Sequence, residues 1–273
     1  MERGICCARE YGIAMASANP HEINRVLRYA RASLSILAFI LAFESRAPLL
    51  ARDPPPDLIY RAAKKESENE AARNQYMYRQ TVIVQDFSSR DSPGGEYREV
   101  REVIFFPSGE RTERLVGKPL SNLRWLKLTD EDFRDIREVQ PALMTTETLF
   151  LYESKYGGEE DAEGVSCWVF RIRPRQILEG QRLFDGLIWI DQRDDSIVRL
   201  QGQAVPQIVT TKSENLFPHF TTVRRKIDGK YWFPAYTAGD DILPFRTGPQ
   251  RIRLTIRYEN YKRFTTDSSI EYK

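Results

Sequence analysis

From residue 75 onward, hydrophobic and polar residues alternate along most of the chain. The alternation is clearest over residues 251–264, where Arg251, Arg253, Thr255 and Arg257 take one set of positions and Ile252, Leu254, Ile256 and Tyr258 the other. A period of two places these sets on opposite faces of a strand. We therefore expect a β-strand with one solvent-exposed face and one covered face.

The same alternation predicts nine further strands, separated by turn-forming residues. We expect turns at residues 92–95, 107–109, 157–158, 194–195 and 228–229, where Gly, Pro, Asp and Ser gather. Short turns between successive strands favour hairpins, and hairpins make an antiparallel sheet. The nine strands are expected at residues 75–87, 97–106, 110–116, 148–156, 165–173, 182–191, 196–204, 220–227 and 230–234.

Two segments have a helical period instead. Residues 57–74 follow a Pro-rich stretch and carry Leu58, Ile59, Ala62 and Ala63 on one side, which predicts an amphipathic helix. A shorter helix is expected at residues 130–139, with Thr129 as its N-cap, three acidic residues in its first turn and a proline soon after its end.

These elements predict a mainly β (α+β) domain over residues 52–273. Ten strands are too many for one flat sheet, so the sheet is expected to curl or to close on itself. No change of composition marks a second domain, and no fixed period marks a repeat protein.

The first 51 residues have a different character. An uncharged, mostly apolar run at 32–43 follows Arg25, Arg28 and Arg31 and precedes small residues, which is the order of a secretory signal peptide. We expect cleavage after Ala47 or Ala51. Because the charged part before the run is long, translation is expected to begin at Met15 rather than Met1. A membrane anchor and an ordinary buried helix are the alternatives, although an anchor needs about 20 apolar residues.

Charge and composition narrow the classes of partner. The chain is 41% hydrophobic and 29% charged, which is typical of a protein with a packed core. Its net charge of +2 is accounted for by the six Arg and four Glu of the first 51 residues. The remainder is neutral, so it lacks the basic field that recruits nucleic acid.

Candidate catalytic residues are few. After Ala51 the sequence holds one histidine, His219, and one cysteine, Cys167, which is expected to be a buried, inert thiol. No multi-residue His and Cys zinc site can be built from these, and no metal or cofactor motif is present. The acidic pairs Asp194–Asp195 and Asp240–Asp241 are expected to be solvated, because neighbouring residues of a strand point apart.

Aromatic side chains recur on many of the predicted strands. They would fill a core or line a cleft for an apolar ligand, and the alternation alone favours the core. The residues that would line such a cleft are Tyr76, Tyr78, Phe105, Phe150, Tyr152, Trp168, Phe170, Trp189 and Trp232.

The order of elements resembles a known family. A helix that runs into residues 74–80 (NQYMYRQ), the stretches at 156–174, 184–191 and 197–199, the DGKYWFP run at 228–234 and YENY at 258–261 look like the lipoprotein carrier LolA and its relatives LolB and RseB. The resemblance covers residues 57–264. It implies an unclosed half-barrel with helices across its concave side, an apolar cavity for acyl chains, and Arg79 as a contact to a helical lid.

We therefore expect a non-enzymatic periplasmic protein that binds the acyl chains of lipoproteins or lipids. One alternative is an RseB-like sensor or interaction module that binds an envelope membrane protein. A second alternative is a hydrolase-type enzyme, which would require Asp240, Asp241 and His219 to converge within hydrogen-bond reach.

Overall fold

The computed structural model describes residues 53–88, 92–105, 111–138, 144–178, 180–209 and 214–263. The predicted signal segment and the predicted turn at 107–109 lie outside these residues. The elements below all belong to one compact unit, Arg52–Lys273. No helix in the described ranges is long and apolar enough to cross a membrane.

Both predicted helices are present. Helix α2 spans Leu58–Arg73 and helix α3 spans Asp130–Glu138, with a short 3₁₀ helix η1 at Leu149–Leu151. In α2 the buried residues Leu58, Ala62 and Glu66 follow each other at intervals of four. This interval places them on one side of the helix, toward the sheet.

The strands form one large antiparallel sheet and a small separate ladder. The order in the large sheet is β3-β2-β1-β13-β12-β11-β8-β7-β6-β5, with β4 also paired to β2, while β9 pairs with β10. The strands are β1 Tyr76–Phe87, β2 Pro93–Phe105, β3 Arg111–Leu115, β4 Leu120–Ser121, β5 Tyr152–Ala162, β6 Val165–Pro174, β7 Leu183–Asp191, β8 Ile197–Val205, β9 Ile208–Val209, β10 Glu214–Asn215, β11 Phe220–Ile227, β12 Tyr231–Phe245 and β13 Gly248–Arg263.

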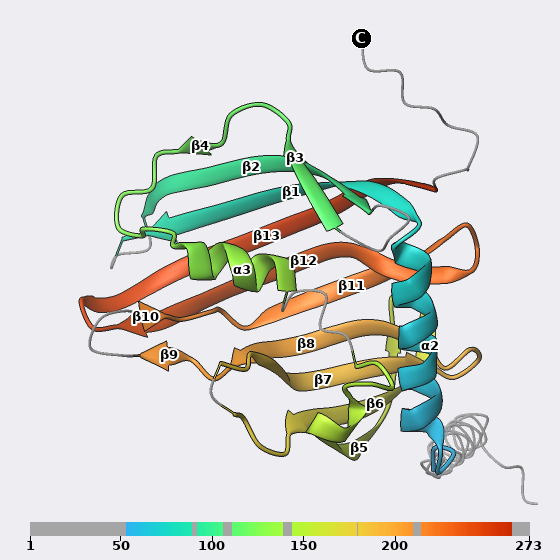
Figure 1. The fold of residues 1–273 in the computed structure, drawn as a ribbon. Coiled ribbons are helices and arrows are strands. Elements are labelled where there is room, and N and C mark those ends of the chain that lie inside the picture. Colours follow the sequence, from blue (N-terminus) through green and yellow to red (C-terminus); the bar gives the residue numbers. More distant parts are fainter. Residues whose placement is uncertain are drawn as a thin grey trace, which may run out of the picture. The chain divides into compact units, whose positions relative to one another are not determined.

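The sheet is open. Strands β3 and β5 end the order and do not pair with each other, and α2 and α3 both lie in front of the same face (Figure 1). This confirms the predicted fold class: a mainly β chain whose antiparallel sheet does not close into a barrel and whose helices cover one side.

The main core lies between the helices and this face. Leu58 and Ala62 of α2 and Ile136 of α3 join the same buried cluster as Ile256 of β13 and Trp168 of β6. The predicted alternation in β13 is confirmed, because Ile252, Leu254, Ile256 and Tyr258 are buried while the intervening residues are partly or fully exposed.

A second cluster is buried on the opposite face of β6, β7 and β8. It contains Cys167, Trp189 and Trp232. Long basic side chains cover it: the Arg199 guanidinium lies 4.6 Å from the centre of the Trp189 ring, and the Lys226 ammonium lies 5.4 Å from that of Trp232. Such side chains shield apolar surface with their stems while their charged ends stay in water.

Two predicted turns are wrong. Gly157 and Gly158 lie inside β5, where they form a bulge opposite β6, and the real turn follows at Glu163 and Gly164. Residues 93–95 are likewise the start of β2. In both places the glycines are part of a paired strand. A β-bulge or a close approach of two backbones favours a residue without a side chain.

The last hairpin is longer than predicted. Strand β12 continues past Pro234 to Phe245, and β13 begins at Gly248. The Gly, Asp and Pro residues of 239–244 have the composition of a loop, but pairing with β13 overrides it. At Gly239 a side chain would come within 2.6 Å of the His219 carbonyl oxygen, so the glycine here reflects close packing. The short strands β4, β9 and β10 were not predicted.

Candidate functional site

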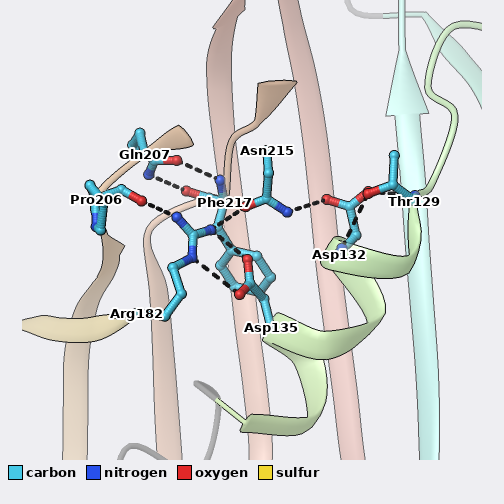
Figure 2. A network of polar contacts seen from close by, with 8 residues as sticks. All are labelled: Thr129, Asp132, Asp135, Arg182, Pro206, Gln207, Asn215 and Phe217. Atoms are coloured by element: carbon cyan, nitrogen blue, oxygen red, sulfur yellow. Dashed lines mark hydrogen bonds and ion pairs between the residues drawn. The ribbon is translucent and has the colours of Figure 1, made fainter. Parts of the chain in front are cut away.

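Helix α3 is attached to the sheet chiefly through Arg182, the residue that precedes β7. Its Nε donates to Asp135 Oδ1 at 3.1 Å and its Nη2 donates to Asp135 Oδ2 (Figure 2). The guanidinium also donates to the Pro206 carbonyl and to the side-chain oxygen of Asn215. The Arg182 and Asp135 side chains are 14% and 5% exposed. A bidentate pair fixes orientation as well as distance, so it sets where α3 lies.

Asn215 and Asp132 extend this network to the first turn of α3. Asn215 Nδ2 donates to Asp132 Oδ1 at 3.2 Å. Asp132 Oδ2 accepts from the backbone N–H of Thr129 at 2.7 Å and from its hydroxyl at 2.9 Å, and the Asp132 N–H donates back to Thr129 Oγ1 at 3.3 Å. This reciprocal capping confirms Thr129 as the N-cap. We call the contacts of Arg182, Asp135, Asn215 and Asp132 the α3 latch.

The carboxylates of the α3 latch, Asp132 and Asp135, are largely shielded from solvent. Burial raises the pKa of Asp132, the two donors of Thr129 lower it, and the charges of Asp135 and Glu131 raise it again, so that the pKa lies above its usual range. The ionised form of Asp132 is therefore disfavoured in this buried position, whereas the Arg182–Asp135 pair compensates two opposite charges. The latch is a balance of opposing charge effects.

The segment before β11 is fixed next to the latch. Gln207 Nε2 donates to the Phe217 carbonyl at 2.9 Å, and the Phe217 N–H donates to Gln207 Oε1 at 2.8 Å. This pair of hydrogen bonds holds residues 216–218 against the sheet face that α3 covers.

A small apolar cavity lies beneath α3. Its volume is about 50 Å³, whereas pockets for small organic ligands measure about 300–1,000 Å³. The cavity is thus far smaller than a ligand pocket, and most apolar residues described on the helix-covered face are buried in the main core. The lining residues are Val84, Leu126, Lys127, Leu128, Asp132, Ile136, Glu214, Leu216, Phe217, Pro218, Phe245, Ile252 and Leu254.

The aromatic residues expected to line a cleft do not lie together. Tyr78, Phe105, Trp168 and Phe170 are buried in the main core, and Tyr152 packs against it. Tyr76 packs edge-on against Phe233 at 5.1 Å between ring centres. Trp189 and Trp232 belong to the cluster on the opposite face, and Phe150 is 71% exposed. None of the nine lines the cavity beneath α3, whose walls are mostly aliphatic.

Arg79 lies on the face opposite the helices. It pairs with Glu102 on the neighbouring strand at 3.1 Å, and the adjacent Tyr78 is the residue that points into the core. The arginine that contacts α2 is Arg224 of β11, whose Nη1 donates to Glu66 Oε2 at 2.6 Å. Their side chains are only 2% and 1% exposed. An ion pair removed this completely from water stabilises little unless its geometry is excellent.

The proposed catalytic trio does not converge. Asp241 Oδ2 lies 2.7 Å from His219 Nδ1, but Asp240 binds Arg251 and Arg253 on the other side of the strand. The arginines hold the pKa of Asp240 below its usual range. The Asp194–Asp195 pair also separates, to Lys226 and to Arg61. Among the described residues no three His, Cys, Asp or Glu side chains are placed to bind a metal ion.

Sequence reasoning missed the residues that attach the helices. Two of them had a signal in the pattern. Glu66 continues the stripe of Leu58 and Ala62, and Arg224 continues the inward positions Phe220 and Thr222. A charge at a core position of each element points to a buried ion pair. Arg182 and Asp135 had no such signal, because Arg182 is the first residue of the predicted strand at 182–191 and Asp135 lies on a mostly acidic helix.

Comparisons with known proteins add a likeness of fold. No protein-family model and no curated protein matches the sequence. The similar solved structures include a DUF1329 family protein from Desulfovibrio piger, with 14% identity, 80% of this chain and 96% of that chain covered, and a TM-score of 0.37.

Two other solved structures are also similar. A putative outer membrane lipoprotein-sorting protein domain from Vibrio parahaemolyticus has 11% identity, covers 76% of this chain and 93% of that one, and has a TM-score of 0.33. A LolA superfamily protein from Nitrosomonas europaea has 13% identity, covers 75% and 95%, and also has a TM-score of 0.33. All three likenesses are weak in sequence identity and in TM-score, so function has to be argued from this chain's own residues.

Proposed function

We propose that this protein is a non-enzymatic binding protein of the periplasm that holds an acyl chain of a lipoprotein or lipid between α3 and the sheet. The main support for this proposal is that the sheet face and helix α3, which are in contact there, differ in polarity. The sheet face beneath α3 is apolar, with Val84, Ile252 and Leu254 around the cavity. The helix that covers it is mostly charged.

Helix α3 has little apolar surface with which to hold its place. Its sequence, DEDFRDIRE, offers only Phe133 and Ile136 to the core. Complete burial of such side chains stabilises by about 1.5–3 kcal/mol each. The remaining attachment is the α3 latch, which is polar and therefore able to exchange its partners for water when α3 moves away.

Displacement of α3 would create room for a ligand. The cavity of about 50 Å³ is a fraction of what an acyl chain fills, so binding of such a chain would require α3 to move away from the sheet. An acyl chain that replaces Phe133 and Ile136 on the sheet would restore the apolar contacts that the helix gives up. Its binding would gain about 25 cal/mol for each Å² of apolar surface buried, before ordering costs.

The test is a titration of delipidated full-length protein with a fluorescent acyl probe. Two neighbouring positions of β1 give a matched pair: Val84 lines the cavity, and Ile83 points to the opposite face. Val84→Phe fills the cavity and is expected to weaken saturable binding by about tenfold or more, equivalent to roughly 1.4 kcal/mol. Ile83→Phe is expected to bind as the wild type does. Absence of saturable binding by the wild type, or equal binding by Val84→Phe, would refute the proposal.

The open sheet favours a second candidate, a protein-interaction module. Within the described residues, β3 and β5 each have one side that pairs with no other strand, and an unpaired edge is a template on which another chain can add a strand. Pull-down from envelope extracts separates the two functions, because a carrier brings lipoproteins and an interaction module brings a membrane protein.

Export is part of the proposal. The apolar run at 32–43 with its arginines and small flanking residues supports it. Mass spectrometry of the periplasmic form is expected to give an N-terminus after Ala47 or Ala51, and an intact Met1 or Met15 terminus would contradict export by cleavage.

A further inference from the structure

The segment that leads from the end of β3 to α3 is basic, although the unit as a whole is neutral. Residues 114–127 contain Arg114, Lys118, Arg124 and Lys127 and no acidic residue. Arg114 pairs with Glu102. In the described part of the chain, no carboxylate lies within ion-pair distance of Lys118, Arg124 or Lys127. We call residues 114–127 the basic loop.

The basic loop also exposes large apolar side chains. Leu120 is 68% exposed and Trp125 is 48% exposed, and Leu115 and Val116 are exposed as well. Solitary apolar residues on a surface are ordinary, but several within one short segment mark an interaction site. Here they are interleaved with the basic residues.

The exposure is built into the fold. The buried carboxylate of Asp86 accepts from the backbone N–H groups of Arg124, Trp125 and Leu126 at 2.8, 2.7 and 3.1 Å. It also accepts from the Gly95 N–H at 2.6 Å. Three of these four donors belong to the loop, so the Asp86 carboxylate fixes the second half of the loop to the end of β1.

The rest of the loop is fixed on strand β2. The Val116 N–H donates to the Val100 carbonyl at 2.8 Å, and Leu120 and Ser121 pair with β2 as β4. Leu123 and Leu126 pack against the main core. Leu123 and Leu126 are therefore the residues of the loop that point toward the core. Leu120 and Trp125 stay exposed to solvent, although the same loop packs against apolar residues.

Trp125 has a defined place on this surface. Its ring lies against Gly94, where a side chain would come within 2.0 Å of Trp125 Cζ3. The indole therefore lies against the β2 backbone at Gly94, while about half of the residue stays exposed. An indole held at a surface in this way suits the boundary between water and lipid, where tryptophan is enriched.

We propose that the basic loop docks the protein onto an anionic lipid bilayer. Lys118, Arg124 and Lys127 meet the negative headgroups, while Leu120 and Trp125 enter the boundary with the acyl chains. Electrostatic contacts alone and a few apolar side chains alone each give only weak membrane binding, and the basic loop combines the two. An acidic protein partner would use the charges and would not need the two apolar side chains. Lys127 also lines the acyl cavity, but the other residues of the proposed contact do not, so Val84→Phe is expected to leave docking unchanged.

The test is co-sedimentation with vesicles, using the protein as purified from cells and comparing variants that carry the same N-terminus. One set of vesicles is phosphatidylcholine alone, and the other contains equal parts of phosphatidylcholine and phosphatidylglycerol. The wild type is expected to bind the anionic set more tightly, and salt is expected to weaken that binding. Leu120→Ser/Trp125→Ser and Lys118→Glu/Arg124→Glu are each expected to weaken it by about tenfold or more.

Matched controls lie elsewhere on the surface. Phe150→Ser/Leu178→Ser removes two exposed apolar side chains outside the loop and is expected to bind as the wild type does. Leu120→Ser alone guards against misfolding of the Trp125 variant, because Leu120 is the more exposed of the two. Equal binding by the loop variants and the wild type overturns the proposal. Loss of binding in the charge variant with no loss in the apolar variant also overturns it, since that pattern means electrostatic adsorption without insertion of Leu120 and Trp125.

Fluorescence gives a second readout. The other three tryptophans, at 168, 189 and 232, are already buried, so a change of emission reports on Trp125. A shift to shorter wavelength with anionic vesicles, and none with phosphatidylcholine alone, is the expected result. An unchanged emission spectrum at saturating vesicle concentration contradicts the insertion of Trp125.

Discussion

Arg182 donates to both carboxylate oxygens of Asp135, and this one pair joins the start of β7 to α3 across 47 residues of sequence. Helix α2 is attached differently, through four buried apolar side chains and a buried ion pair. The sheet therefore carries one firmly packed helix and one that depends on a polar contact. In this account α3 is the element that moves.

Removing one side of the Arg182–Asp135 pair should loosen α3. Asp135→Ala leaves the Arg182 guanidinium poorly compensated in a place that is mostly shielded from solvent, which costs about 3–5 kcal/mol. We expect faster amide exchange over residues 130–138 and a lower urea midpoint. The control is Glu153→Ala, which breaks the exposed pair with Arg173 and should change stability by less than about 1 kcal/mol. Equal effects of the two substitutions would count against the latch.

The Arg224–Glu66 pair should behave as a buried ion pair. Glu66→Ala is expected to destabilise by about 3–5 kcal/mol, because it strands the Arg224 charge in the core. The double variant Glu66→Leu/Arg224→Met is expected to recover most of this loss or to exceed wild-type stability. Urea unfolding of the three proteins measures both steps. A double variant no more stable than Glu66→Ala would show that the pair is needed for packing.

Asp86 should hold the basic loop only while it is ionised. Burial would raise the pKa of its carboxyl, but the N–H donors of Trp125, Leu126, Arg124 and Gly95 outweigh burial and hold the pKa below its usual value. A lowered folded-state pKa contributes stability that is present above the ordinary value of about 3.9 and is lost as pH falls through the folded value.

The matching substitution is Asp86→Asn, which removes the charge and turns an amide N–H₂ toward backbone donors. We expect a loss of about 1–3 kcal/mol at neutral pH. The difference from wild type should stay constant down to about pH 5 and shrink below about pH 4. Urea unfolding as a function of pH measures it, and a difference that grows with acid would be inconsistent with the anchor.

Cys167 should be unreactive in the folded protein. Burial raises the pKa of its thiol to about 12, so almost no thiolate is present at neutral pH. Labelling of the Cys167 peptide by iodoacetamide at pH 8, read by mass spectrometry, should be slow until urea unfolds the chain. Rapid labelling under native conditions would mean that the cluster around Trp189 opens easily.

Much of the fold was predictable because the alternation of apolar and polar residues specifies a β-strand unambiguously in most of the strands. The alternation in β13 specifies both the strand and its buried face, and the Asp228–Gly229 turn lies where its residues allow positive φ angles. The extension of β12 was not predictable, because Gly239 and Pro244 locally favour a loop. Only the partner strand β13 keeps them in the ladder.

The candidate site was less predictable than the fold. Aromatic residues were the natural candidates for an apolar site, yet packing distributes them over three clusters and the surface. The contacts that position α3 depend on Arg182, which precedes β7, and on Asn215 of the two-residue strand β10. Sequence alone does not place such short segments next to a helix. Exposure of Leu120 and Trp125 likewise depends on which leucines of the loop turn inward.

Amide hydrogen exchange of α3 tests the central claim most directly. The full-length protein would be measured with and without an acyl ligand at a concentration shown to saturate the probe site. If the ligand enters by displacing α3, exchange over residues 130–138 should accelerate by on the order of tenfold, while residues 58–73 of α2 stay unchanged. Unchanged exchange in α3 at full saturation, or a change confined to α2, would contradict binding beneath α3.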